Sequence, residues 1–168
     1  MSKYLEMIKK QRGQKKSDKF EGTFLDYLKE LEKNPGIAQH AHKRLYNAIC
    51  EKGSHVLPTE DDRKHKIFNG DNIKIYDYFK EDFYGNERVI EKLMRFLKGA
   101  SLRGEESRQV LLLMGPVGAG KSALTEHIKA ALEDKPYYHL KDDPQRGEPL
   151  QLLPRSLRQE FEKMLNVK

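Results

Sequence analysis

Residues 110–122 read Val-Leu-Leu-Leu-Met-Gly-Pro-Val-Gly-Ala-Gly-Lys-Ser. The first five residues form a continuous apolar run, which is typical of a strand buried on both faces of a parallel sheet. The other eight match the pattern G-x-x-x-x-G-K-[ST] at every fixed position. Apolar residues at helical spacing follow, at Leu124, Ile128, Ala131 and Leu132. A strand, a Gly-rich turn and a helix in this order predict a phosphate-binding P-loop.

Each residue type in the motif has a physical role. Glycine permits backbone conformations that turn successive N–H groups toward phosphate oxygens, and the following helix adds the positive end of its dipole. Lys121 is expected to reach the β- and γ-phosphates of ATP, and the Ser122 hydroxyl to be a ligand of Mg²⁺. A Gly-rich turn that binds nothing is the alternative, but it would leave the lysine ammonium unfavourably close to a helix N-terminus. The predicted ATP-binding residues are therefore Gly115, Pro116, Val117, Gly118, Ala119, Gly120, Lys121 and Ser122.

The sequence lacks one part of a P-loop ATPase. Such an enzyme also needs an apolar strand that ends in an acidic residue, which holds Mg²⁺ and polarises the attacking water. No segment after Lys121 has this form, so the catalytic residues are unknown. Besides residues 110–114, residues 137–140 are predicted to form a second short strand, and one or two strands are too few for the sheet that carries a P-loop. We therefore expect an α/β protein in which a helical N-terminal region precedes the start of an α/β/α sandwich, truncated from a longer chain.

The front of the chain is predicted to be helical. Thr23 and Asp26 form an approximate capping box for a first helix, which ends at residues 34–36, Asn-Pro-Gly. A second apolar stripe runs over residues 37–49 and is closed at Gly53. The two helices are expected to pack as a hairpin.

A change of character follows this helical front. Residues 54–66 are polar and aperiodic, which predicts a surface loop. The dipeptide Asn69-Gly70, with apolar residues on either side, suggests a small β-hairpin. We divide the chain into a helical N-terminal region with a basic arm, residues 1–66, and the first part of the nucleotide-binding domain, residues 67–168.

Two further helices are predicted in the second region. Asn86 is placed to cap a helix over residues 86–99, whose apolar stripe comprises Val89, Ile90, Leu93, Phe96 and Leu97. A last helix is expected over residues 156–165, with Leu157, Phe161 and Leu165 on its inner face.

The charge is concentrated at one end of the chain. Charged residues make up 35% of the sequence, and the net charge is +6. Seven Lys or Arg against two acidic residues fall within residues 1–19, so most of the excess is a basic arm. No aromatic residues are interleaved with basic ones as in a nucleic-acid-binding patch, so a solvated helix end or a contact with an acidic protein is the preferred interpretation.

The remaining composition limits the location and the metal chemistry. Cys50 is the single cysteine, so a disulfide framework is excluded, and its apolar neighbours predict a small buried thiol. No segment has the roughly 18 apolar residues of a membrane span, and the N-terminus carries no apolar targeting segment. A cytoplasmic protein is expected. His40 and His42 lack ligand partners at metal-site spacing and are interpreted as solvated helix residues.

Several segments resemble the opening of the AAA domain of the PrkA-type serine protein kinases. The resemblance is carried by Phe-Glu-Gly-Thr-Phe at 20–24, Ile-Ala-Gln-His-Ala-His-Lys-Arg-Leu-Tyr-Asn at 37–47, Phe-Tyr-Gly at 83–85, the P-loop stretch 111–122 and Glu-Pro-Leu at 148–150. It spans most of the chain, and its Ala-Gln-x-Ala-His helix is more specific than the P-loop alone. One departure stands at residues 142–147, where Asp-Asp-Pro-Gln-Arg-Gly replaces the Cys-Pro-Met-His stretch of the family.

The resemblance implies a bacterial cytoplasmic AAA+ module that binds ATP with Mg²⁺ and belongs to a protein that phosphorylates serine in a protein substrate. Phe83, Tyr84 and Gly85 fall where AAA+ proteins line the adenine pocket, although core packing is an alternative role for the two aromatic residues. Assembly into a homo-oligomer through the AAA+ module is implied as well. Two other functions stay open: ATP-driven protein remodelling or proteolysis, and a module that docks a partner without catalysis.

Overall fold

The computed structural model describes residues 4, 6, 21–133, 135 and 137–164. Every Lys and Arg of the basic arm lies outside these residues. The chain forms two compact units, residues 1–35 and residues 36–168. The domain boundary predicted after residue 66 stays a prediction, and so does the packing of the first two predicted helices, because they belong to different units.

The first unit contains helix α2 (Phe24–Lys33), whose start agrees with the predicted capping box. The Thr23 hydroxyl accepts a hydrogen bond from the Asp26 amide at 3.3 Å, and Asp26 accepts one from the Thr23 amide at 3.1 Å. Thr23 thus satisfies an amide that the first turn of the helix would leave without a partner. Tyr27 and Leu31 form the buried side of the helix.

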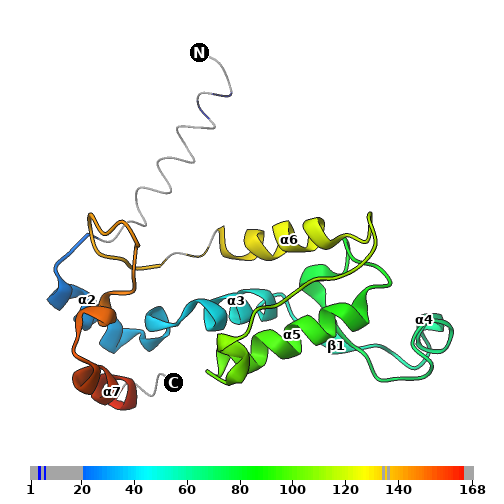
Figure 1. The fold of residues 1–168 in the computed structure, drawn as a ribbon, viewed down its shortest axis with the longest axis horizontal. Coiled ribbons are helices and arrows are strands. Elements are labelled where there is room, and N and C mark those ends of the chain that lie inside the picture. Colours follow the sequence, from blue (N-terminus) through cyan, green and yellow to red (C-terminus); the bar gives the residue numbers. More distant parts are fainter. Residues whose placement is uncertain (1–3, 5, 7–20, 134, 136, 165–168) are drawn as a thin grey trace. The chain divides into compact units, whose positions relative to one another are not determined.

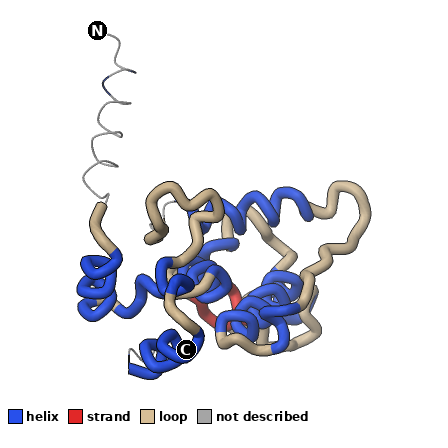
Figure 2. The backbone as a smooth tube through the Cα atoms, turned by 60° about the vertical axis from the view of Figure 1, so that its left-hand side comes forward, coloured by secondary structure: helices blue, strands red, loops and turns tan. Residues whose placement is uncertain are grey.

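The described residues of the second unit are mainly helical and contain one small sheet (Figures 1 and 2). Its regular elements are, in chain order, η1 (Pro35–Ala38, which begins one residue before the unit), α3 (Ala41–Cys50), β1 (Ser54–Val56), α4 (Asp62–Lys66), β2 (Lys74–Tyr76), η2 (Asp77–Phe79), α5 (Glu87–Ser101), η3 (Glu105–Arg108), α6 (Lys121–Glu133), η4 (Pro149–Leu152) and α7 (Arg155–Met164). The η elements are single 3₁₀ turns.

Helix α5 supplies the central face of the main core. Its buried apolar residues are Ile90, Leu93, Met94 and Leu97, and α3 and η2 pack against the same cluster. The prediction of the helix is confirmed, but Met94 takes the buried place expected for Val89, which is exposed. Asn86 precedes the helix without a side-chain capping bond, so its predicted capping role is wrong. Cys50 is half-buried against this core.

The small sheet corrects the interpretation of residues 54–76. Strand β1 pairs antiparallel with β2, with His55 opposite Ile75, so residues 54–66 are not a plain loop. Asn69 and Gly70 do not form the predicted hairpin turn, because the strands begin further out and α4 lies between them. Buried Leu57, Phe68, Ile73 and Ile75 form a second core beneath this segment.

The two strands predicted after residue 109 are absent from the described part of the chain. Residues 110–114 form a loop, and Val110, Leu112 and Met114 are 92%, 74% and 82% exposed. A strand buried on both faces needs neighbours on both edges, and the only sheet among the described residues pairs β1 with β2 alone. Residues 137–140 are also irregular. The structure therefore agrees with a fragment of an AAA-type domain and does not contain a complete sandwich.

Helices α6 and α7 were predicted from their apolar spacing and are present. Leu124 and Ala131 on α6 are buried, with Ile128 and Leu132 packed partly against the main core. On α7, Leu157 is more exposed than expected, and Leu165 lies outside the described residues.

Candidate functional site

The predicted P-loop connects the exposed segment to α6. In Figure 1 the chain runs from the C-terminal end of α5 back to the start of α6, and residues 115–120 make the final turn. Gly118 and Gly120 have φ angles of +81° and +77°, and a side chain at either position would meet open space but a strained backbone. These two glycines of the motif therefore allow the left-handed backbone conformation that the turn requires.

Lys121 closes over the loop from the first residue of α6. Its Nζ donates hydrogen bonds to the carbonyl oxygens of Gly115 and Pro116, at 2.9 and 2.6 Å. The ammonium thus lies at the mouth of the turn and is compensated by backbone oxygens of its own loop. Phosphate oxygens are stronger acceptors for an ammonium, so the residues present fit a bound polyphosphate.

Ser122 and the start of α6 complete the arrangement. Ser122 is exposed in the first turn of the helix, where amide groups lack intrahelical partners and the dipole favours an anion. Its predicted contact with Mg²⁺ stays a prediction. Among the residues that the structure describes, no group of three or more His, Cys, Asp or Glu could hold a metal ion.

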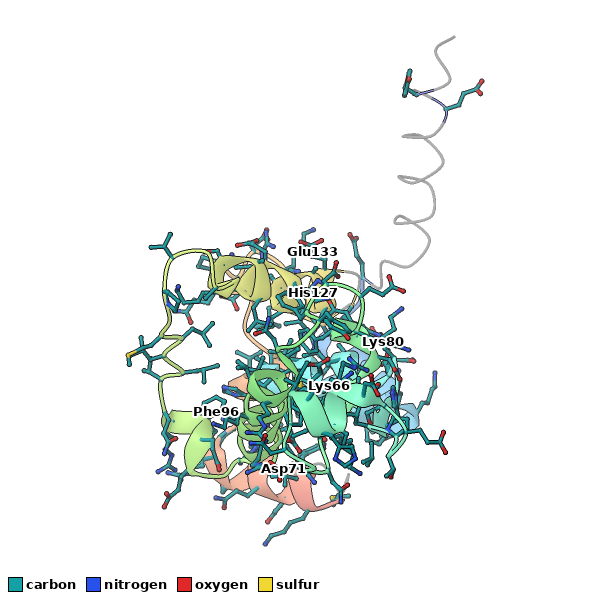
Figure 3. All side chains as sticks on the ribbon, turned by 90° about the vertical axis from the view of Figure 1, so that its right-hand side faces the viewer. Lys66, Asp71, Lys80, Phe96, His127 and Glu133 are labelled. Carbon is teal, nitrogen blue, oxygen red and sulfur yellow. The ribbon has the colours of Figure 1, made fainter. Side chains whose placement is uncertain are left out.

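Helix α6 is attached to the rest of its unit through His127, labelled in Figure 3. The Tyr78 hydroxyl donates a 2.8 Å hydrogen bond to the His127 carbonyl, and the ring Nε2 of His127 lies 3.0 Å from the Tyr78 carbonyl. The ring also contacts Phe79 and Phe83, with centroids 5.5 and 5.4 Å away. These contacts fix the helix that carries Lys121.

The predicted adenine segment has two different environments. Phe83 belongs to the main core, whereas Tyr84 is 69% exposed and lies beneath the Arg63 guanidinium at 4.8 Å. Phe83 contacts His127, which is six residues beyond Lys121 and hence about 9 Å along the helix axis. The segment therefore borders the same helix as the loop, and its contact with adenine stays a prediction.

Arg63 organises a polar cluster beside Tyr84 that the sequence analysis missed. It bonds to Asp61 at 2.7 Å and to Glu87 at 2.8 Å, and the hydrogen bonds from Arg63 hold the pKa of Asp61 at about 2. Glu87 is buried, and its Oε2 has no hydrogen-bond partner among the described residues. Asp61 directly before Asp62-Arg63 is a helix-capping signal that could have revealed α4.

The histidines that were expected to be solvated lie partly inside the unit. His40 caps α3, since its Nδ1 accepts a hydrogen bond from the Lys43 amide at 3.3 Å, and its ring lies 5.8 Å from that of His42. Both histidines line a pocket formed with the segment after α6. No helix in the described part of the chain is long and apolar enough to cross a membrane.

Comparison with known proteins gives a family match and two relatives that agree with the resemblance found in the sequence. The family model described as "PrkA AAA domain" matches residues 22–168. The chain is 34% identical over 164 residues to "ATP-dependent protease PrkA" of Bacillus subtilis, covering 94% of the chain and 24% of that protein. It is 35% identical over 127 residues to "Serine/threonine kinase YeaG" of Escherichia coli K12, covering 76% of the chain and 19% of that protein.

A more distant likeness extends to another group. The "Lon protease homolog, mitochondrial" of Bos taurus is 28% identical over 149 residues, covering 79% of the chain and 15% of that protein. The chain thus spans about a quarter or less of each of these relatives. No solved structure matches it.

Proposed function

The chain belongs to the PrkA AAA domain family, and on that premise we propose that it binds ATP with Mg²⁺ through residues 115–122. The observation that carries this proposal is the position of the Lys121 ammonium, within 2.9 Å of the Gly115 and Pro116 carbonyl oxygens at the start of α6. The two carbonyl oxygens compensate the ammonium, and the charged oxygens of a phosphate would be stronger acceptors at the same place. The sequence motif, the loop conformation and the family support the proposal that a nucleotide phosphate binds here.

Each residue of the loop has a defined role in the proposal. The backbone amides of residues 117–122 bind phosphate oxygens, Lys121 neutralises charge at the β- and γ-phosphates, and the Ser122 hydroxyl holds Mg²⁺. Bound Mg²⁺ supplies charge neutralisation between the phosphates. Residues 83–85 border the adenine.

Replacing the lysine tests this assignment. Lys121→Ala removes a charge-assisted contact of roughly 1.5–3 kcal/mol, so ATP affinity measured by calorimetry should fall about 10- to 150-fold. Lys129→Ala is the matched control, because Lys129 lies on the same helix and pairs with Glu126 at 2.6 Å. Equal ATP affinity of the Lys121→Ala variant and the control would refute the proposal.

For the whole protein we propose phosphoryl transfer from ATP to serine in a protein substrate. The support is the family and the relative named as a serine/threonine kinase. The names of the Bacillus subtilis and Bos taurus relatives support the alternative, an ATPase that drives proteolysis or remodelling. A cytoplasmic homo-oligomer built through the AAA module fits both functions.

One experiment separates these two functions. The full-length protein is incubated with γ-labelled ATP and a candidate protein substrate, and the products are analysed by mass spectrometry. Phosphoserine on the substrate supports the kinase, whereas new peptide termini that depend on ATP support the protease. The same incubation with Lys121→Ala shows whether either product needs the P-loop.

A further inference from the structure

A second pocket lies at the other end of α6 from the P-loop. It has a volume of about 700 Å³ and lies within the unit of residues 36–168, between η1 with the first turn of α3, the segment 137–148 and the start of α7. The P-loop joins α6 at Lys121, whereas Tyr137 and Tyr138, which line the pocket, follow the other end of the helix at Glu133 (Figure 1). A helix of 13 residues is about 20 Å long, so the pocket and the P-loop are separate sites.

The walls of the pocket carry mostly one sign of charge. The basic lining residues come from four different segments, and Glu148 is the one carboxylate among the lining residues, all of which belong to the described part of the chain. The positively charged residues are Arg44, Arg103, Arg146, Arg155 and Arg158, and His40 and His42 line the pocket beside them. A concave surface with one sign of charge and low-dielectric walls concentrates the field and attracts counter-ions.

Two of these arginines take part in none of the ion pairs of the described structure. Arg146 and Arg155 form no ion pair with any described carboxylate, although both line the pocket. Asp143 fixes the turn that presents Arg146, because its carboxylate accepts hydrogen bonds from the Gln145 and Gly147 amides at 3.0 and 2.7 Å. The turn thus fixes the backbone that carries the exposed side chain of Arg146.

Arg44 and the N-termini of α3 and α7 add further positive charge to the pocket. Arg44 donates to the Lys135 carbonyl at 3.3 Å and lies 5.0 Å over the Tyr137 ring, and burial lowers the pKa of its guanidinium. The first turns of α3 and α7, ten residues each, line the pocket and contribute the positive ends of their dipoles. Arginine in such a setting pairs with phosphate through two parallel hydrogen bonds.

The size of the pocket limits the ligand. About 700 Å³ falls in the range of small-molecule sites, which is roughly 300–1,000 Å³. A polymer of nucleic acid needs an extended basic groove instead. Tyr137 and Tyr138 add aromatic surface beside the arginines.

We propose that this pocket binds a small phosphorylated ligand of nucleotide size, independently of the P-loop. The arginines bind the phosphate groups and the tyrosines border the rest of the molecule. The chain therefore has two anion sites, one at each end of α6.

Inorganic pyrophosphate is the probe for the second site. In the Lys121→Ala chain, in which the P-loop is impaired, pyrophosphate binding should persist in calorimetry. Adding Arg146→Gln and Arg155→Gln to that chain should weaken this binding at least about 10-fold, since two charge-assisted contacts are lost. Arg95→Gln is the control, because Arg95 is exposed on α5 and does not line the pocket.

Three results would overturn the proposal. The first is the loss of all pyrophosphate binding in the Lys121→Ala chain, and the second is equal weakening by Arg95→Gln and by the double arginine variant. The third is arginine-dependent binding of polyglutamate without binding of pyrophosphate, which would assign the pocket to an acidic polypeptide. Circular dichroism of each variant shows whether the helices are retained.

Discussion

His40 caps helix α3 from a half-buried position that is surrounded by positive charges. As the cap of α3 it accepts a hydrogen bond from the Lys43 amide, which requires an unprotonated Nδ1. Burial lowers its pKa, and the positive charges of Arg103, His42 and Lys43 lower it further. An interaction with the Ser101 backbone opposes these effects without reversing them. The folded protein therefore prefers neutral His40.

This preference makes the stability of the second unit depend on pH. Above a pH of about 6.5 His40 is neutral in both the folded and the unfolded chain, so stability is at its full value. As the pH falls through 6.5 to the lower folded pKa, the unfolded chain binds the proton first and stability is lost. His40→Asn keeps a good capping residue and should remove this part of the loss.

Urea unfolding at pH 7.5 and pH 5 measures the effect. The difference in unfolding free energy between the two pH values should be smaller for His40→Asn than for the unchanged chain. His65→Asn serves as the control, because His65 is exposed on α4. An undiminished difference in His40→Asn would show that other groups cause the pH dependence.

Residues whose contacts are close in sequence could be predicted, whereas residues whose contacts are distant in sequence could not. Lys121 contacts Gly115 and Pro116, five and six residues away, so its position follows from local spacing. His40 is influenced by Arg103, and Arg63 bonds to Glu87, over separations that no local pattern encodes. The sequence therefore led to the wrong interpretation of His40 as solvated, and it gave no indication of the Arg63 cluster.

At the scale of elements, α6 depends on few buried contacts. Leu124 and Ala131 are its buried residues, and Leu124 is 6% exposed one turn after Lys121. Leu124→Ala should lower the unfolding free energy by about 2–5 kcal/mol, the usual cost of truncating a buried leucine, because it leaves a cavity in the main core. It should also weaken ATP binding, since the loop is positioned by this helix.

Chemical denaturation and ATP calorimetry on the same variant check both effects. Thr125→Ala is the control, because Thr125 is exposed on α6 and bonds only within the helix, to the Lys121 carbonyl at 3.0 Å. If Leu124→Ala destabilises the chain and leaves ATP affinity unchanged, the position of α6 does not control the loop.

The elements also show where periodicity succeeds and fails. The stripes of α5 and α6 were recognised because a helix satisfies its own backbone hydrogen bonds, so local sequence is sufficient. The apolar run at 110–114 was assigned to a strand, but a strand requires a partner, and the described residues provide none. The pairing of β1 with β2 was missed because three-residue strands carry too little alternation to detect.

At the scale of the whole molecule, the question is whether the chain contains the groups that ATP hydrolysis needs. Phosphoryl transfer depends on positioning and on neutralising charge at the γ-phosphate. The described residues supply the P-loop part, and among them no strand follows Lys121 that could carry an acidic Mg²⁺ ligand at its end. Interactions with the ground state of ATP do not by themselves accelerate its hydrolysis.

These 168 residues are therefore expected to bind ATP and not to turn it over. An arginine supplied by a neighbouring subunit is worth about 10³–10⁵ in kcat in P-loop enzymes, and an acidic Mg²⁺ ligand and a water-orienting group are needed as well. The exposed apolar run at 110–114 also leaves the loop without a sheet behind it, which weakens its hold on the nucleotide. Steady-state phosphate release by the purified chain, with Lys121→Ala as the blank, should stay at the assay floor. Turnover of about 1 s⁻¹ or more that disappears in Lys121→Ala would mean that these residues contain a catalytic acid.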